Sequence, residues 1–154
     1  MTSKTSRVCL VSSGGGHLTE LLALRGAYAT RDHFFVLNRI LPIPPQMQER
    51  TFLICHSERD WRFFVNLWEA WQILRRERPS VILSTGAGPA VPFALVGKWL
   101  GITNVFVECS TQIIRPSLTG RIMYHLADRF YYQWHSLERH YPRGKYGGVL
   151  LWSL

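Results

Sequence analysis

Acidic residues are scarce in this sequence. Against 18 lysines and arginines it holds only 10 aspartates and glutamates, so the formal net charge is +8 at pH 7. That balance favours an anionic partner, such as nucleic acid, a phosphate ester or a surface of acidic lipid headgroups. A basic surface that is merely solvated is the alternative interpretation.

Cysteine is scarce as well. The three cysteines, Cys9, Cys55 and Cys109, form no C-x-x-C pair, and their number is odd. This pattern argues against a disulfide framework and against a zinc site, and it favours reduced, buried thiols. We therefore predict no metal site and no cofactor.

Long apolar runs are also missing. No segment approaches the roughly 20 apolar residues that a membrane-spanning helix needs. The apolar run near the N-terminus is too short for a signal peptide. We therefore expect a cytoplasmic chain that is either dissolved or bound to a membrane surface without crossing it.

Apolar runs alternate with helical patterns along the whole chain. Runs rich in valine, isoleucine, leucine and phenylalanine predict strands over 7–12, 33–38, 51–56, 80–85, 104–109, 129–134 and 147–152. Helices are expected between them, over 17–28, 60–79, 88–101 and 117–127, with Asp60 and Ser117 as N-caps. The proline-rich segment 39–50 cannot be regular throughout.

Continuous apolar strands that alternate with helices indicate a parallel sheet covered on both faces. We predict an α/β fold, a single Rossmann-like, doubly wound domain over residues 1–154. In such sheets, ligands bind in the crevice at the carboxyl ends of the strands. The loops at those ends are therefore the places to look for chemistry.

The loop after the first predicted strand is rich in glycine and reads Ser13, Gly14, Gly15, Gly16, His17. Residues without side chains let phosphate oxygens approach backbone N–H groups, and the following helix N-terminus adds positive potential. The dinucleotide fingerprint G-x-G-x-x-G is not completed, because Thr19 holds the third glycine position. A tight turn without a ligand is the alternative.

His17 opens the first predicted helix. The positive end of the helix disfavours an imidazolium, and a neutral imidazole can take a proton from a sugar hydroxyl as a general base. A histidine that caps the helix without any catalytic part is the alternative.

A second glycine-rich loop follows the fourth predicted strand. It reads Ser84, Thr85, Gly86, Ala87, Gly88, and the next residue, Pro89, suits the first turn of a helix. Two such loops at neighbouring positions of the crevice predict two phosphates or a diphosphate.

Charged residues gather after the fifth predicted strand. Glu108 can bind a hydroxyl, act as a base or orient His17, and equally it can pair with an arginine. Arg115 and Arg121 flank a helix start at Ser117, and together they suit an anionic group or form a solvated basic helix end.

Two helical segments are more apolar than surface helices should be. Residues 60–76 carry three tryptophans beside arginines, and residues 88–101 have Lys98 as their only charge. Burial against the sheet is one explanation, and contact with lipid headgroups is the other. The aromatic residues lie at core spacing and no nucleic-acid-binding motif is present, so we predict no nucleic-acid partner.

Several stretches together resemble a known family: "SSGGGHLTELL", "STGAGPAVPFALVGKWLG", "VEC", "PSLTGRIMYHLADRFYYQW" and "YPRGKYGG". They resemble bacterial exopolysaccharide and capsule proteins related to the membrane-recruiting subunit of the eukaryotic dolichol-linked UDP-GlcNAc transferase. The resemblance runs from Val8 to Leu151. That family is similar to the amino-terminal half of the peptidoglycan GlcNAc transferase, a GT-B enzyme with two Rossmann domains.

The resemblance implies an acceptor-binding subunit whose UDP-sugar donor is held mainly by a separate donor-binding chain. The implied reaction is inverting transfer of a hexosyl or glucuronosyl unit to a polyprenyl-pyrophosphate-linked sugar at the inner face of the plasma membrane. Glucuronate, galactose and GlcNAc all remain possible donor sugars.

Carried over by motif, both glycine loops face the acceptor diphosphate, His17 holds the position of the proposed base, and Glu108 matches an acidic residue. Gln112 stands where an arginine is expected in many relatives, and segment 39–50 matches no known motif. A non-catalytic recruiting subunit is one alternative, and a free-standing nucleotide-binding module is another.

Overall fold

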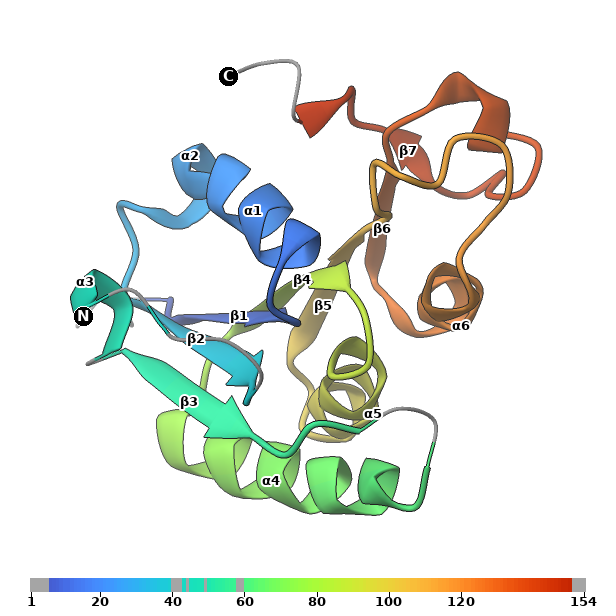
Figure 1. The fold of residues 1–154 in the computed structure, drawn as a ribbon. Helices are drawn as coiled ribbons and strands as arrows, with labels where there is room; N and C mark the ends of the chain where they lie inside the picture. The colour runs from blue at the N-terminus through green and yellow to red at the C-terminus, as the bar shows by residue number, and fades with distance from the viewer. Residues whose placement is uncertain (1–5, 40–42, 44, 49, 58–59, 151–154) are drawn as a thin grey trace.

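Seven parallel strands form one sheet in the order β3-β2-β1-β4-β5-β6-β7 (Figure 1). The structure is a computed structural model that describes residues 6–39, 43, 45–48, 50–57 and 60–150. The strands are β1 (Val8–Ser12), β2 (His33–Asn38), β3 (Thr51–Ile54), β4 (Val81–Gly86), β5 (Thr103–Val107), β6 (Arg129–Tyr132) and β7 (Lys145–Tyr146). The strand order reverses between β1 and β4, which confirms the predicted doubly wound fold.

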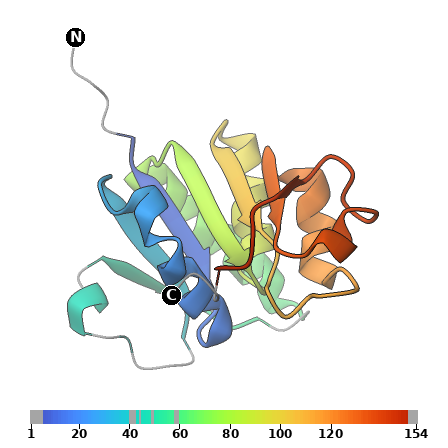
Figure 2. The same cartoon turned by 90° about the horizontal axis from the view of Figure 1, so that it is seen from above.

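Helices cover both faces of the sheet, as Figures 1 and 2 show. On one face lie α1 (Gly16–Ala23) and α2 (Arg25–Tyr28), and on the other lie α4 (Arg62–Glu77), α5 (Ala90–Trp99) and α6 (Leu118–Leu126). Two short elements complete the described chain, α3 (Pro45–Gln48) and the 3-10 helix η1 (His135–Leu137). The helix predicted over 17–28 is thus two helices, with Leu24 between them.

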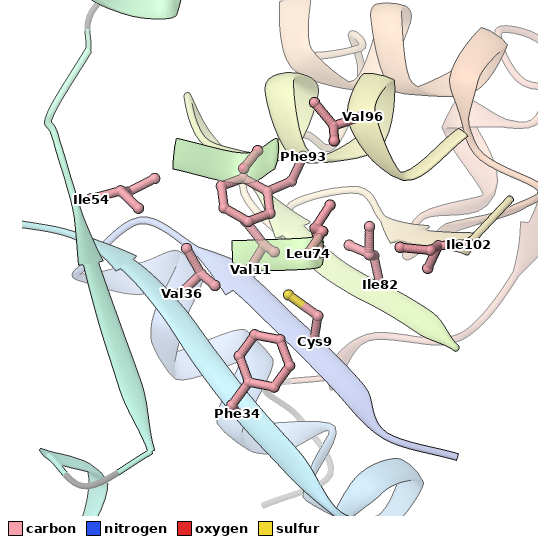
Figure 3. Packing of buried hydrophobic residues seen from close by; sticks show 11 residues of the cluster. Cys9, Val11, Phe34, Val36, Ile54, Leu74, Ile82, Phe93, Val96 and Ile102 are labelled. Carbon is pink, nitrogen blue, oxygen red and sulfur yellow. The ribbon is translucent and has the colours of Figure 1, made fainter. Parts of the chain in front are cut away.

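The largest apolar cluster lies between the sheet and helices α4 and α5 (Figure 3). Side chains of alternate strand residues point into it, because successive residues of a strand face opposite sides. Its buried members include Cys9, Val11, Phe34, Val36, Ile54, Leu74, Ile82, Phe93, Val96 and Ile102. Full burial of one such aliphatic or aromatic side chain contributes about 1.5–3 kcal/mol, so this cluster anchors both helices to the strands.

The predicted helix ends are found close to their expected places. Ser117 caps α6, because its Oγ accepts a hydrogen bond of 2.7 Å from Gly120 N. Asp60 Oδ1 accepts one of 3.1 Å from Arg62 N at the start of α4. Helix α4 ends before Pro79 with Arg78 in the left-handed conformation at φ 47°.

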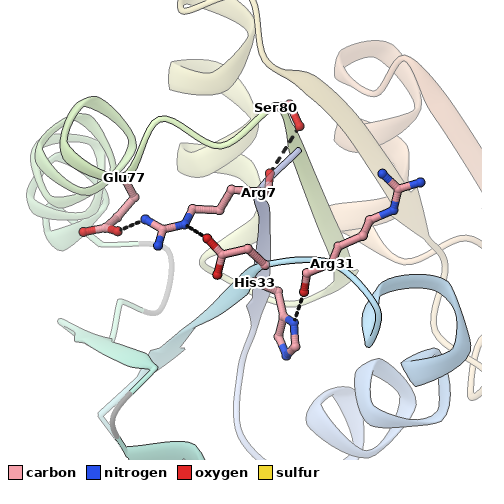
Figure 4. Close-up of polar contacts among 6 residues, drawn as sticks. Arg7, Arg31, His33, Glu77 and Ser80 are labelled. Atoms are coloured by element: carbon pink, nitrogen blue, oxygen red, sulfur yellow. Dashed lines mark hydrogen bonds and ion pairs between the residues drawn. The ribbon is translucent and has the colours of Figure 1, made fainter. Parts of the chain in front are cut away.

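One arginine, Arg7, links the amino ends of β1 and β2 to α4 (Figure 4). Arg7 Nε donates to Asp32 Oδ2 at 2.7 Å, and its Nη1 donates to Glu77 at the end of α4. The hydrogen bond from Arg7 to Asp32 raises the pKa of the guanidinium further. This ion-pair cluster joins β1, the start of β2 and α4 at the edge opposite the predicted site.

The strand predicted over 147–152 is wrong within the described residues. The last strand is β7, and residues 147–150 cross the sheet face outside any strand. Gly148 turns the backbone at φ 80°, and Leu150 N then donates to Gln133 Oε1 at 2.9 Å, so the apolar run serves as a strap. Residues 151 and 152 lie outside the described part.

Candidate functional site

A cleft of about 690 Å³ opens at the carboxyl ends of the strands on either side of the point where the strand order reverses. Four helices of eight or more residues begin beside it, namely α1, α4, α5 and α6. Its lining residues are Ser13, Gly14, His17, Asn38, His56, Ser57, Phe63, Ala87, Gly88, Val91, Leu118, Thr119 and Ile122. No aspartate or glutamate is among these described lining residues, and the helix N-termini beside them favour an anion.

The first glycine loop turns from β1 into α1 at this cleft. Gly15 adopts φ 78°, a conformation that glycine takes without strain, and its carbonyl accepts the first helical bond from Thr19 N. Gly14 N donates to Asn38 Oδ1 at 3.0 Å. The loop is therefore tied to the end of β2, and its Gly14 N–H is already used.

His17 is locked to the second glycine loop by a reciprocal pair of hydrogen bonds. Its Nδ1 lies 3.1 Å from the carbonyl oxygen of Thr85, while Thr85 Oγ1 donates to the carbonyl of His17 at 2.7 Å. A carbonyl only accepts, so Nδ1 carries the proton and Nε2 is the acceptor of the neutral ring. That is the tautomer a general base requires.

The second glycine loop is shaped by close neighbours. A Cβ on Gly86, which has φ 123°, would lie 3.1 Å from the His17 ring, and one on Gly88 would lie 2.9 Å from the carbonyl oxygen of Ser57. Ser84 and Thr85 are fully buried, and Ala87 also takes a positive φ of 65°. These glycines thus make room for protein atoms as well as for any ligand.

Three polar residues at the ends of β2 and β3 were not predicted from the sequence. Asn38 Nδ2 lies 3.0 Å from His56 Nδ1, and since an amide nitrogen only donates, that imidazole nitrogen accepts. Ser57 Oγ bonds to Asn66 of α4 and completes this side of the cleft. Their position at or next to the carboxyl ends of predicted strands was the available signal, because all parallel strands end at one edge.

The other side of the cleft is apolar. Phe63 comes from the first turn of α4, Val91 from α5, and Leu118 and Ile122 from α6. Leu118 and Ile122 are 50% and 40% exposed. The cleft therefore has a polar half beside His17 and an apolar half between the three helix starts.

Glu108 does not line this cleft. Its carboxylate is buried and accepts hydrogen bonds from Ser117 Oγ at 2.8 Å, from the Tyr141 hydroxyl and from Cys109 N at 3.1 Å. Burial and the bond to Glu108 raise the pKa of the Tyr141 phenol. The structure thus uses Glu108 to hold the start of α6, and it does not bring the carboxylate to His17.

A second buried carboxylate was not predicted at all. Glu20 of α1 accepts from Ser110 N at 3.0 Å and from Gln133 Nε2 at 3.2 Å, and Gln133 Nε2 also donates to the Glu108 carbonyl. Its spacing from Leu24 places it on the inward stripe of the helix, which was the signal in the sequence. Glu20 positions the segment that follows β5.

Some of the predicted site residues line the cleft and others do not. The lining includes Ser13, Gly14, His17, Ala87 and Gly88. Outside the lining are Gly15 before α1, Gly16 at the start of α1, and Ser84, Thr85 and Gly86 at the end of β4. Ser117 is an N-cap, and Arg115 and Arg121 are exposed and do not belong to the lining. Within the described residues, no three histidine, cysteine, aspartate or glutamate side chains are placed to hold a metal ion.

A second cavity of about 610 Å³ lies on the sheet face that carries α1 and α2. Its walls are mostly apolar and come from β4, β5 and β6, from α2 and from the strap at 147–150. None of the predicted site residues lines it. Among the helices that the structure describes, none is both long and apolar enough to span a bilayer.

Solved structures that resemble this chain are glycosyltransferase and epimerase proteins. The chain superposes on Acinetobacter baumannii MurG with a TM-score of 0.69 at 14% identity, covering 85% of this chain and 42% of that one. On UDP-N-acetylglucosamine 2-epimerase from Rickettsia bellii the TM-score is 0.76 at 11% identity, covering 97% and 46%. This chain thus spans less than half of each of those proteins, and at such identities the likeness shows the fold alone.

Sequence comparison gives the family. The human UDP-N-acetylglucosamine transferase subunit ALG14 is 28% identical over 94% of this chain and 82% of its own length. The pattern of the family described as "Oligosaccharide biosynthesis protein Alg14 like" matches residues 55–150, which is more than half of the chain. The chain therefore belongs to the Alg14 family.

Proposed function

We propose that this chain, as a single domain over residues 1–154, is the acceptor-binding subunit of a two-chain inverting glycosyltransferase. The observation that carries the proposal is the orientation of His17. Its Nδ1–H is held by the Thr85 carbonyl, so Nε2 is the basic atom of a ring that lines the cleft. A base beside the acceptor hydroxyl is what an inverting, single-displacement transfer needs.

In the proposed reaction, His17 Nε2 takes the proton of the acceptor hydroxyl while that oxygen attacks the anomeric carbon of the donor sugar. The bond from this carbon to the UDP oxygen breaks, and UDP leaves with the electron pair. The N-termini of α1, α5 and α6 supply positive potential for the acceptor diphosphate. The absence of carboxylates among the described lining residues suits a diphosphate as well.

The relatives support the proposed donor and partner. The human relative is a subunit of a UDP-N-acetylglucosamine transferase, so we place UDP-GlcNAc first among the donors, ahead of UDP-galactose and UDP-glucuronate. The human relative is named as a subunit, which supports a separate donor-binding chain that completes the enzyme. We assign the donor site to that partner.

The acceptor is proposed to be a polyprenyl-pyrophosphate-linked sugar at the cytoplasmic surface of a membrane. The net charge of +8 suits both the diphosphate and acidic headgroups. The matched curated relative is eukaryotic, so it lends no support to an exopolysaccharide or capsule pathway. The proposal therefore names only the assembly of a lipid-linked saccharide.

The test is replacement of His17 by alanine in the complex with the partner chain. Loss of a general base lowers turnover by about 10²–10⁴-fold, with partner binding unchanged in a pull-down. His140→Ala, at an exposed histidine outside the cleft lining, is the matched control and keeps full activity. A fall of only a few-fold with the complex intact refutes the base and supports a non-catalytic recruiting subunit.

A free-standing nucleotide-binding module is tested by calorimetry on the chain alone. Tight binding of NAD, ATP or a UDP-sugar without any partner contradicts the proposed division of labour.

A further inference from the structure

Large aromatic side chains stand in solvent on helices α4 and α5. Phe64, Trp68 and Trp99 are 71%, 61% and 74% exposed, although such residues are normally buried. With Leu95 and the half-buried Trp71 they make up a surface that we call the aromatic ledge. A contiguous apolar surface of this kind marks a contact with another molecule.

Helical spacing puts the ledge on the outer side of both helices. Phe64, Trp68 and Trp71 follow one another at i, i+4 and i+7 along α4, whereas Asn66, Ala70 and Leu74 form its buried stripe. The ring centroids of Trp71 and Trp99 are 4.6 Å apart, which joins the two helices into one surface. Figure 1 shows α4 and α5 side by side on the sheet face away from α1.

Basic side chains lie at the ledge. The Arg75 guanidinium lies over the Trp71 ring at 4.9 Å from its centroid, and Lys98 is exposed beside Trp99. The acidic residues of α4 are engaged elsewhere, because Glu69 accepts from Cys55 N at 3.1 Å and Glu77 pairs with Arg7. Tryptophan and arginine side by side suit the headgroup layer of an anionic bilayer.

The ledge is continuous with the apolar half of the cleft. Phe63 of the cleft lining is next to Phe64 in the first turn of α4, and on α5 the residues Val91, Leu95 and Trp99 are spaced four apart. Residues four apart lie on one face of a helix. Val91 in the cleft is therefore the first member of a stripe that ends at Trp99 on the ledge.

We propose that the aromatic ledge is the surface with which this chain binds an anionic lipid bilayer, with its tryptophan rings at headgroup depth. The cleft then opens at the bilayer surface, where a diphosphate on a membrane-embedded chain reaches His17 without leaving the lipid. This second statement rests on the proposed function, whereas the binding of the bilayer does not.

The test measures binding of the whole chain to vesicles of phosphatidylcholine and phosphatidylglycerol at 3:1, by co-sedimentation and by quenching of tryptophan fluorescence with brominated lipid. Trp68→Ser and Trp99→Ser each lower the partition coefficient about tenfold, since half of an exposed indole surface loses its burial. Arg75→Gln lowers it about fivefold on these vesicles and leaves binding to pure phosphatidylcholine unchanged. Leu53→Ser is the matched control, because Leu53 is 38% exposed on β3, on the other sheet face, and its replacement leaves binding as it was.

Two results overturn the proposal. One is wild-type binding by both tryptophan variants. The other is a dimer of the chain in solution that Trp99→Ser dissociates while vesicle binding persists, which makes the ledge a protein interface. The His17→Ala variant separates the two proposals, because it keeps vesicle binding if the ledge is right, whatever happens to sugar transfer.

Discussion

Gly120 is expected to be the least replaceable glycine of the chain. It lies in the first turn of α6, and a Cβ built on it would stand 1.8 Å from Glu108 Oε2 and 2.5 Å from the Tyr141 hydroxyl. Real Cβ atoms do not approach other atoms so closely. The Glu108 carboxylate is buried and held by several donors, so it cannot move aside without losing them.

The cost of Gly120→Ala follows from these contacts. Displacement of the carboxylate breaks its bonds to Tyr141 and Ser117, each worth about 1–3 kcal/mol in a buried site. The better helix propensity of alanine returns about 1 kcal/mol. The net loss of unfolding free energy is about 3 kcal/mol, which lowers the melting temperature by about 9 °C for a chain of this length.

Urea denaturation followed by circular dichroism measures this loss. Gly26→Ala is the matched control, because Gly26 lies in helix α2 and a Cβ at this position would meet no atom of a neighbouring element within 4 Å; this variant gains up to about 1 kcal/mol. The free energy of unfolding of Gly97→Ala is expected between those of the other two variants, since the added Cβ would lie 2.4 Å from the flexible end of the Ile82 side chain. If Gly120→Ala is as stable as the wild type, the interpretation of Glu108 as the anchor of α6 is refuted.

Two further substitutions probe the surroundings of Glu108, and cysteine labelling probes the burial of Cys9. Tyr141→Phe removes a hydrogen-bond donor to the buried Glu108 and lowers the free energy of unfolding by about 2 kcal/mol, as measured by urea denaturation at pH 8. Equal urea midpoints for this variant and the wild type would contradict the prediction. Burial raises the pKa of Tyr141 above its unfolded value of about 10. The stability that this group contributes is therefore complete below about pH 10 and is lost as the pH rises through the folded pKa. Tyr141→Phe weakens this loss of stability at alkaline pH. Ser117→Ala removes the N-cap of α6 and a hydrogen bond to Glu108, and it lowers the free energy of unfolding by about 2 kcal/mol in the same assay. Cys55 reacts first with iodoacetamide at pH 8, as mass spectrometry will show, because Cys9 is buried with a raised pKa and stays protonated; early labelling of Cys9 would refute its burial.

The fold was predictable because it follows from local patterns. Continuous apolar strands such as Val8–Ser12 occur only where both sheet faces are covered, and the intervening helices set the parallel topology. One exception was the C-terminal run, where Gly147 and Gly148 precede the apolar residues and the chain crosses the sheet as a strap. Periodicity does not distinguish a strap from a short strand.

The site was predictable only in part, because sequence shows which residues end a strand but not where their side chains bond. The glycine loops and His17 lie at the cleft as expected. Glu108 directly follows β5, yet its carboxylate bonds to Ser117 and Tyr141, and Tyr141 is 33 residues away in the sequence. Such long-range partners leave no trace in spacing, and the same holds for Asn38 and His56.

The pair of hydrogen bonds between His17 and Thr85 has a mechanical consequence. The two residues are 68 positions apart, yet each uses a backbone carbonyl of the other's loop, so the two loops cannot move independently. A displacement of either one by a ligand is transmitted to the other as if they were a single rigid part. Helix α6, which begins at Leu118, forms the opposite wall of the cleft and has no such hydrogen bond to His17. A shift of this helix is therefore the expected way for the cleft to accommodate acceptors of different size.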